Sequence, residues 1–269
     1  MSASRYPIPI TPNLTDRVVR RARNVPIFCP VCGRLSAAVK FDDNLRESGR
    51  CRRCAATNRQ RQTALVACRS MAERTGTKVR DLPALAALPG VDIYNTEAQG
   101  PVHDRLHGAA GYRCSEYLGP DHAPGERVGD VFHEDLMGLS YADDSFDLVL
   151  SSDVFEHVPE PYVGHAEVHR VLKPGGHHVF TVPFHHDRVS DEIRARVHED
   201  GHIEHVAPPI YHDTPAARQD ILVFTIFGLE MLVRLAELGF DPRYSVLREP
   251  WYGIVGANAI VFDAVKTTK

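Results

Sequence analysis

The stretch from Leu139 to Phe184 constrains the fold of this chain more than any other segment. It runs through an apolar strand (FDLVLSS, 146–152), a helix over 161–172 with apolar residues at helical spacing, a Lys-Pro-Gly-Gly turn and a second apolar strand, HHVFTVPF. An apolar run that ends in small polar residues is typical of a buried parallel strand. The turn ends the helix, because proline cannot continue it and glycine adopts positive φ. The segment therefore predicts half of a doubly wound α/β domain, in which ligands bind at the carboxyl ends of the strands.

The length of 269 residues suits one domain with a small additional module. No apolar run is long enough to span a bilayer, so no membrane-spanning helix is expected. The amino-terminal residues lack the apolar region of a secretory signal, and we therefore expect a cytoplasmic protein.

The charges divide the chain into two parts. Residues 1–80 hold 17 lysines and arginines against 5 acidic residues, a net charge of +12, whereas residues 81–269 carry −16. Such a division predicts two modules with different electrostatic roles. Either the basic module docks on the acidic one, or it attracts an anionic partner such as RNA.

Four of the six cysteines form two CxxC pairs, Cys29 with Cys32 and Cys51 with Cys54. Two such pairs can place four thiolates around a tetrahedral Zn²⁺, and their spacing is that of a zinc ribbon. Disulfides are the weaker explanation for a cytosolic protein. Four thiolates leave no open coordination position, so the predicted zinc site is structural.

A helical pattern follows the second cysteine pair and ends near Gly76. We therefore assign residues 1–76 to a basic zinc module and residues 77–269 to the α/β domain. Four arginines of the module bind a phosphate or nucleotide, contact the acidic domain or form a solvated basic face, namely Arg52, Arg53, Arg59 and Arg61.

The sequence of residues 139–184 also resembles the segment between the fourth and fifth strands of class I S-adenosylmethionine-dependent methyltransferases. Within that class it is similar to the methyltransferase type 11 family. The shared elements are D-x-S-F-D-L-V-x-S, E-H-V, R-V-L-K-P-G-G and a closing proline. The resemblance implies an enzyme with a Rossmann-like methyltransferase sheet and S-adenosylmethionine as its cofactor.

The loop after the expected first strand, residues 91–95, departs from the pattern of that family. The family has an acidic residue and a glycine-rich loop there, whereas this chain reads N-T-E-A-Q-G-P, with one glycine. By the resemblance, Thr96 and Glu97 lie beside the cofactor, with Glu97 near its ammonium group, and Gly100 allows a close backbone approach. The departure leaves open a repurposed protein that kept the fold with a degenerate cofactor loop.

The ends of the next strands complete the predicted cofactor site. Glu116 ends the expected second strand, where one carboxylate can accept hydrogen bonds from both ribose hydroxyls, and Tyr117 follows it. By the resemblance, Asp135 accepts from the adenine amino group, with the backbone of Leu136 beside it. The end of the fourth strand is expected to line the methionine part of the cofactor with Ser151, Ser152 and Asp153.

The next residues suggest two alternative roles near the methyl acceptor. Asp153, Glu156 and His157 resemble the ExxEH pattern of methyltransferases that bind a divalent metal, and positions i, i+3 and i+4 of a helix share one face. Many family members carry the same E-H pair without a metal. In those proteins the histidine serves as a general base or a hydrogen-bonding group, and a purely structural histidine is the third possibility.

Residues 185–220 form an insertion after the fifth expected strand, where methyltransferases of this fold build a lid over the acceptor. It is rich in histidine, and we predict acid–base or hydrogen-bonding roles for His205 and His212. The alternative is a hairpin with solvated polar side chains.

Three functions follow from these observations. The first is a methyltransferase that acts on a small-molecule or glycan acceptor, transferring the methyl group to oxygen or nitrogen. The second is an RNA methyltransferase that uses the basic zinc module to bind RNA. The third is the repurposed protein without methyl transfer.

Overall fold

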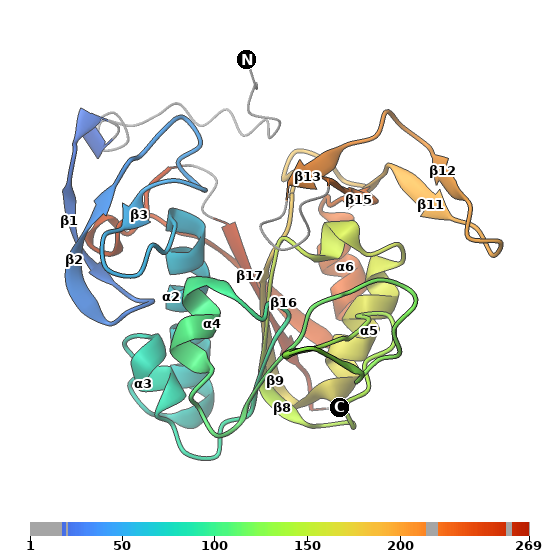
Figure 1. Ribbon diagram of the computed structural model, residues 1–269, viewed down its shortest axis with the longest axis horizontal. Coiled ribbons are helices and arrows are strands. Elements are labelled where there is room, and N and C mark those ends of the chain that lie inside the picture. The colour runs from blue at the N-terminus through green and yellow to red at the C-terminus, as the bar shows by residue number, and fades with distance from the viewer. Residues whose placement is uncertain (1–17, 20, 214–219, 257–259, 269) are drawn as a thin grey trace.

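The computed structural model describes residues 18–268 apart from 20, 214–219 and 257–259 (Figure 1). Its centre is a six-stranded sheet with the order β16-β17-β9-β8-β4-β5. These strands are β4 (Ile93–Asn95), β5 (Tyr112–Cys114), β8 (Phe146–Ser152), β9 (Leu172–Thr181), β16 (Phe240–Val246) and β17 (Ile260–Lys266).

The sheet has the doubly wound arrangement expected from the sequence. β4 pairs in parallel with β5 on one side and with β8 on the other, and β8 pairs in parallel with β9. β17 is antiparallel to both β9 and β16, which places β16 at the edge. The order of the parallel strands reverses at β4, so ligands are expected beyond the carboxyl ends of β4 and β8. The Rossmann-like fold class is confirmed.

The expected third strand, residues 131–136, is reduced to a short hairpin. β6 (Arg127–Val128) pairs with β7 (Val131–Phe132), and one parallel bridge joins His133 to Glu116. The bridge keeps this segment at the position where a third parallel strand would extend the sheet. Its side chains therefore still lie beside the end of β5.

Helices cover both faces of the sheet (Figure 1). On one face lie α2 (Asn58–Thr75), α3 (Leu82–Ala86) and α4 (Gly100–Leu106), and on the other lie α5 (Pro161–Val171) and α6 (Glu230–Glu237). β8 serves both cores because its side chains alternate between faces. Leu148 and Leu150 pack with α2 residues such as Leu65, whereas Val149 packs with α5 residues such as Val168.

Helix α2 begins and ends with well-defined caps. Thr57 forms a capping box with Gln60, and Gly76 ends the helix in the left-handed conformation. The predicted stop near Gly76 is confirmed. The helical pattern at residues 77–89 yields only the short α3, which Asp81 caps by accepting from the Ala84 N–H.

The Lys-Pro-Gly-Gly segment differs from its prediction. It was expected to be a turn, but it belongs to β9, which begins at Leu172 directly after α5. The pairing of β8 with β9 shifts register between Phe146 and Leu148, and Gly175 has a φ of 71° there. A bulge thus absorbs the change from helix to strand.

The amino-terminal module is an antiparallel three-stranded sheet, as expected of a zinc ribbon. Its strands are β1 (Val25–Cys29), β2 (Arg34–Val39) and β3 (Arg50–Cys51). The single turn η2 (Pro250–Tyr252), near the carboxyl terminus, packs against β1. Asn58, at the start of α2, donates to the carbonyl oxygens of Leu45 and Val255, which joins the module to the same carboxyl-terminal segment.

The insertion after β9 is built from short antiparallel pairs. β10 (Glu192–Ile193) pairs with β15 (Thr225–Ile226), β11 (Ala195–Val197) with β12 (Ile203–His205), and β13 (Tyr211–Asp213) with β14 (Asp220–Leu222). The hairpin of β11 and β12 projects away from the domain (Figure 1). Among the described helices, none is long and apolar enough to cross a membrane.

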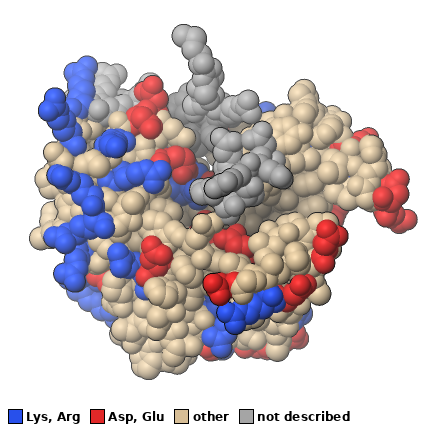
Figure 2. All heavy atoms as spheres, viewed as in Figure 1, with Lys and Arg blue, Asp and Glu red and all other residues tan. Residues whose placement is uncertain are grey.

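Ion pairs join the basic module to the acidic domain. Arg74 of α2 contacts Asp147 at 2.6 Å, and Arg46 contacts Asp153 at 2.6 Å. This geometry supports the interpretation that the two charge-divided parts dock on each other. Other basic side chains remain on the outer surface of the module, which appears as a blue band in Figure 2.

Candidate functional site

The four cysteines predicted to bind zinc converge in the module. Their sulfur atoms all lie within 4.8 Å of one another. Each pair sits in a tight turn in which the first cysteine carbonyl accepts from the residue four positions on, Gly33 in one turn and Ala55 in the other. Gly33 and Ala55 both have φ above 60°, so the turns match in conformation. Four thiolates arranged in this way suit a tetrahedral Zn²⁺.

A buried guanidinium lies beside this cluster. Arg61 donates to the carbonyl oxygens of Gly49, Ala56 and Gly253. Burial lowers the pKa of Arg61 to about 10, and the neighbouring thiols, including Cys51, partly offset that effect. Arg61 therefore places a positive charge close to a site whose four thiolates would leave it negative with Zn²⁺ bound.

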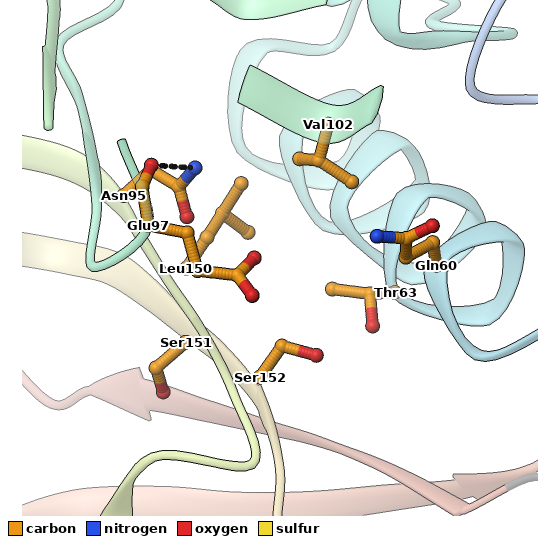
Figure 3. A pocket seen from close by; sticks show the side chains of 8 residues that line it. All are labelled: Gln60, Thr63, Asn95, Glu97, Val102, Leu150, Ser151 and Ser152. Atoms are coloured by element: carbon orange, nitrogen blue, oxygen red, sulfur yellow. Dashed lines mark hydrogen bonds between the residues drawn. The ribbon is translucent and has the colours of Figure 1, made fainter. Parts of the chain in front are cut away.

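A small pocket opens at the carboxyl ends of β4 and β8, as the topology predicts (Figure 3). It encloses about 250 Å³ including open solvent, and α2 forms its other wall. The lining residues are Gln60, Thr63, Asn95, Glu97, Val102, Leu150, Ser151 and Ser152. The enclosed part of this space admits little more than a water molecule, so a ligand as large as S-adenosylmethionine requires the wall formed by α2 to move outward.

Glu97 lies in the atypical loop and extends its carboxylate across the pocket toward Thr63 (Figure 3). Burial raises its pKa to about 7, and Glu116, Asp153 and Glu47 add to that effect while Arg59 opposes it. A carboxyl group with this pKa changes charge near neutral pH.

Two other predicted residues, Thr96 and Gly100, belong to the same loop. Thr96 is buried, and its hydroxyl oxygen has no hydrogen-bond partner within the described residues. Gly100 begins α4 with a φ of 88°, a conformation that glycine adopts without strain. A Cβ at Gly100 would meet only the amide nitrogen of Gln60, at 3.9 Å, so the backbone here can be approached closely.

The end of β5 brings the predicted ribose and adenine groups together. One Glu116 oxygen accepts from the Ala98 N–H at 2.9 Å, and burial raises the pKa of this carboxyl. Tyr117 is 60% exposed. Its partial burial raises its pKa, and the nearby negative charge of Asp135 adds to that effect. Asp135 accepts from the Met137 N–H, so it turns back on its own loop. Leu136 is buried in the core that contains α5.

The three residues at the end of β8 have different orientations. The Ser151 hydroxyl points away from the pocket (Figure 3) and bonds His178 at 3.0 Å. Ser152 accepts from Arg59, and Asp153 accepts from Arg46 at 2.6 and 2.7 Å. Ser151 is therefore a core residue, whereas Ser152 and Asp153 contact the basic module.

Asp153 has a φ of 54°, an unusual conformation for this residue type. Its N–H donates to the Thr181 carbonyl and its carboxylate accepts from the Thr181 hydroxyl, so β9 holds the conformation in place. Burial opposes ionisation, but Arg46 and Arg59 outweigh it and hold the pKa of Asp153 well below its usual range. Asp153 is thus a fixed anion at the pocket.

Sequence reasoning missed the role of Arg46, whereas the contact of Arg59 with Asp153 agrees with one of its predicted alternatives, the acidic domain. Both guanidinium groups reach from the module to the end of β8, where Arg59 also pairs with Glu47 at 2.8 Å. The other three arginines of the predicted quartet behave differently, because Arg52 and Arg53 are exposed and Arg61 is buried. No spacing in the sequence marks Arg46, since its contact with Asp153 joins residues more than 100 positions apart.

The predicted catalytic histidines separate into two groups. His157, on the single turn η1 (Phe155–His157), and His212, on β13, form a cluster with Glu156 in which the ligand atoms lie within 4.8 Å of one another. Asp153, the first acid of the predicted metal pattern, is not part of that cluster. His205 is exposed on the projecting hairpin and lies opposite Ala195.

The family comparison agrees with this geometry. Residues 115–180, from the end of β5 to the end of β9, match the methyltransferase domain family. Over this segment the chain is similar to the methyltransferase domain family, in agreement with the resemblance found in its sequence. The match begins after the atypical loop that follows β4.

Curated relatives match the chain over a short segment. An uncharacterized methyltransferase of Mycobacterium marinum is 50% identical over 58 residues, which is 22% of each chain. One from Mycobacterium tuberculosis is 58% identical over 50 residues, covering 19% of this chain and 20% of its own. This chain thus spans about a fifth of the length of these relatives.

Solved structures are similar at low identity. An S-adenosylmethionine-dependent methyltransferase from Mesorhizobium loti is 19% identical, with 68% of this chain and 94% of that one covered and a TM-score of 0.40. The Burkholderia thailandensis 1,6-didemethyltoxoflavin-N1-methyltransferase, solved with its substrate and S-adenosylhomocysteine, is 16% identical, with 86% and 96% covered and a TM-score of 0.40. With TM-scores this low, neither structure adds to the evidence for the function of this chain.

Proposed function

We propose that this chain is an S-adenosylmethionine-dependent methyltransferase whose acceptor is a small molecule or a glycan. The observation that carries the proposal is the pocket at the carboxyl ends of β4 and β8, inside a chain whose residues 115–180 match the methyltransferase domain family. The carboxyl ends of two neighbouring parallel strands meet there, with Glu97 and Ser152 in the lining, and doubly wound folds bind nucleosides at such a position.

The roles of the residues follow from their positions. One oxygen of Glu116, just after β5, accepts from the Ala98 N–H, and the other suits a ribose hydroxyl, while Tyr117 presents an exposed ring beside it for the adenine. Glu97 suits the cofactor's ammonium group, and the unpartnered hydroxyl of Thr96 suits a polar atom of the same ligand. Arg59 would pair with the cofactor's carboxylate once the wall formed by α2 moves outward.

The chemistry is a direct displacement. A lone pair of the acceptor oxygen or nitrogen attacks the methyl carbon, and the electrons of the broken carbon–sulfur bond return to the sulfonium, which becomes a thioether. The protein mainly holds the two partners in line. Burial lowers the pKa of His157 to about 4, so its ring is neutral at pH 7 and offers a lone pair that can accept a proton or bind a cation.

The test is calorimetric titration of the protein with S-adenosylhomocysteine. We expect one site per chain, and a loss of affinity of about tenfold or more in Glu116→Ala, because the ribose hydroxyls lose their acceptor. Asp130→Ala is the matched control, since that carboxylate is fully exposed on the β6–β7 turn. Absence of binding to the wild-type chain at millimolar ligand would overturn the proposal.

The four cysteines complete the proposal as a structural Zn²⁺ site that fixes β1 and β3 next to α2. With this ion bound, Arg46 and Arg59 are held over the end of β8. The ion would supply no chemistry to the transfer itself, because four thiolates saturate a tetrahedral site.

The exposed basic surface of the module favours RNA as a second candidate acceptor. The exposed cations there are Arg34, Lys40, Arg50, Arg52 and Arg53, and Figure 2 shows basic side chains gathered over this side of the molecule. Against RNA, the larger domain is strongly acidic. Retention of ribosomal RNA in a gel at low salt, lost as the salt concentration rises, would favour this alternative.

A further inference from the structure

A buried carboxylate on η1, just after the end of β8, has no hydrogen-bond partner within the described residues. The side chain of Glu156 is 0% exposed, and neither of its oxygens makes a hydrogen bond within the described residues. An isolated carboxyl group is costly to bury unless it is hydrogen-bonded, paired or bound to a metal. None of the described side chains around Glu156 donates a hydrogen bond to it, so its carboxylate needs another partner, such as a cation.

Two imidazole rings converge on the same oxygen of Glu156. The Nε2 of His157 lies 3.8 Å from it, and the Nδ1 of His212 lies 3.7 Å from it. Both distances exceed that of a hydrogen bond. Two ligand atoms that each bind one ion at about 2.1 Å can be up to about 4.2 Å apart, so both separations suit a shared ion.

The orientation of His157 also points to a ligand. Its Nδ1 lies 2.8 Å from the carbonyl oxygen of Leu222, which makes Nδ1 the protonated nitrogen. Nε2 then carries the lone pair and faces Glu156. A backbone carbonyl that orients a histidine in this way is the usual second contact of a metal-binding imidazole. The Phe224 N–H donates to the Glu156 carbonyl, so the strands that bring His212 also hold η1.

We propose that Glu156, His157 and His212 bind one divalent transition-metal ion at the acceptor side of the pocket. Two imidazoles and one carboxylate suit ions such as Mn²⁺, Fe²⁺, Co²⁺ or Zn²⁺ better than Mg²⁺ or Ca²⁺. Asp153 is excluded as a ligand, because Arg46 and Thr181 already occupy its oxygens. The site thus combines two neighbours in sequence with a histidine 55 positions later, which comes from the insertion.

Three protein ligands leave coordination positions open, as in catalytic rather than structural metal sites. This role rests on the proposed methyltransferase function. An acceptor hydroxyl that binds the ion loses its proton to solvent more readily, and the resulting oxygen lone pair attacks the methyl carbon while the carbon–sulfur electrons return to sulfur. The acceptor class that fits best is a molecule with a hydroxyl and a neighbouring oxygen that chelate one ion together.

The test uses the full chain with zinc retained in the four-cysteine site. Mn²⁺ is titrated while the paramagnetic resonance signal of the free ion is followed, and Co²⁺ is titrated while its visible absorption is recorded. We expect one Mn²⁺ per chain, and Co²⁺ bands without the charge-transfer absorption of thiolates. Glu156→Gln and His212→Ala should each weaken Mn²⁺ binding by about tenfold or more.

His202→Ala is the matched control, because it removes an exposed histidine of the same insertion. Mn²⁺ and Co²⁺ that fail to bind the wild-type chain, or that bind Glu156→Gln and His212→Ala unchanged, would overturn the metal site. S-adenosylhomocysteine titration of the same samples separates the two proposals. A chain that binds the nucleoside but no metal contradicts only the metal site, and a chain that binds metal but no nucleoside contradicts only the methyltransferase function.

Discussion

The described residues hold two clusters of side chains that could bind a metal ion, and these clusters differ in almost every respect. The four cysteines lie within 26 residues of sequence and bring their sulfur atoms together through two matching turns. The cluster of Glu156, His157 and His212 draws its third member from an insertion and has fewer ligands. A closed set of four thiolates suits a structural ion, whereas a set of three with open positions suits chemistry. From this difference we propose that the first cluster stabilises the module and that the second contacts the substrate.

The two clusters are connected through arginine side chains of the module. Arg61 lies beside the cysteines, while Arg46 and Arg59, which flank the Cys51–Cys54 turn in sequence, reach the end of β8. Loss of the first cluster should therefore disturb the second, and loss of the second should leave the first intact. Substitutions in the module, at the contact with the end of β8 and in the pocket test this one-way dependence.

The largest effect is expected from Cys51→Ser. Removing one of four thiolates should abolish zinc binding and lower the free energy of unfolding by at least about 4 kcal/mol, because metal binding and folding of the module are coupled. Urea unfolding with zinc analysis measures both quantities. Cys114→Ser, a half-buried thiol outside the cluster, is the control and should retain zinc. Unchanged stability of Cys51→Ser would contradict a structural role for the site.

The next largest effect is expected from Arg46→Met. This change removes the bidentate partner of Asp153, a mostly buried carboxylate. The free energy of unfolding should fall by on the order of 3 kcal/mol at pH 7. The folded-state pKa of Asp153 is depressed, so its stabilising effect is present above the unfolded value near pH 4 and is lost as the pH falls. The difference between wild type and variant should therefore shrink below about pH 4.

Urea unfolding of both proteins across this pH range supplies the measurement. Arg52→Met, in which an exposed arginine of the same module is replaced, should change stability little. If Arg46→Met and wild type differ in their free energy of unfolding by the same amount at every pH, the ion pair with Asp153 does not contribute to stability.

A smaller effect is expected from Glu97→Gln on cofactor binding. With a pKa of about 7, Glu97 becomes negative as the pH rises from 6 to 8, which favours the ammonium group of the cofactor. The affinity of the wild type for S-adenosylhomocysteine should rise by about tenfold over this range, and that of the variant should stay nearly level. Calorimetry at several pH values is the measurement, with the exposed Asp104→Asn as the control. A rising affinity in Glu97→Gln would remove Glu97 from the ammonium site.

The smallest effect concerns a histidine that has no charged partner. His165 is buried, stacks on Phe155 at 4.0 Å and makes no hydrogen bond through its ring within the described residues. Burial lowers its pKa to about 3, so its neutral form stabilises the fold above pH 6.5, and stability is lost as the pH falls below that value. The loss is at most about 1.4 kcal/mol per pH unit for one such group.

His165→Phe should make the stability less dependent on pH between 6.5 and 5, as measured by urea unfolding. Some dependence should remain, since burial also lowers the pKa of His178. His107→Phe, a substitution at an exposed histidine, is the comparison and should leave the pH dependence unchanged. If the free energy of unfolding depends on pH equally in His165→Phe and wild type, His165 takes up protons in the folded protein as readily as in the unfolded one.

The sequence predicted the parts of the molecule that depend on local spacing. The two CxxC pairs, the apolar run at residues 146–152 and the carboxylate of Glu116 at a strand end each occupy the expected element. Periodicity and strand order are enough for such features, because the contacts they need lie within a few residues or along one strand. The roles predicted for the individual cofactor residues stay predictions.

The parts that the sequence did not predict depend on contacts between distant segments. Asp153 was assigned to a metal pattern by its distance of three residues from Glu156, but Arg46 folds over it from the module. His212 was expected near the acceptor without a partner, and only the pairing of β13 with β14 brings it to Glu156. Helical spacing also failed locally, since residues 155–157 form a single turn rather than a regular helix.

Helix α2 has a consequence for how this chain can be handled. It follows directly on the second cysteine pair, yet its apolar side covers Leu148, Leu150 and Val179 of the central sheet. A shortened protein that starts at residue 77 would leave this sheet face uncovered and should aggregate. A fragment that stops at residue 76 would in turn expose the buried side of the helix. Neither half alone is therefore suitable for studying the pocket, and a shortened protein should keep the whole chain from β1 to β17.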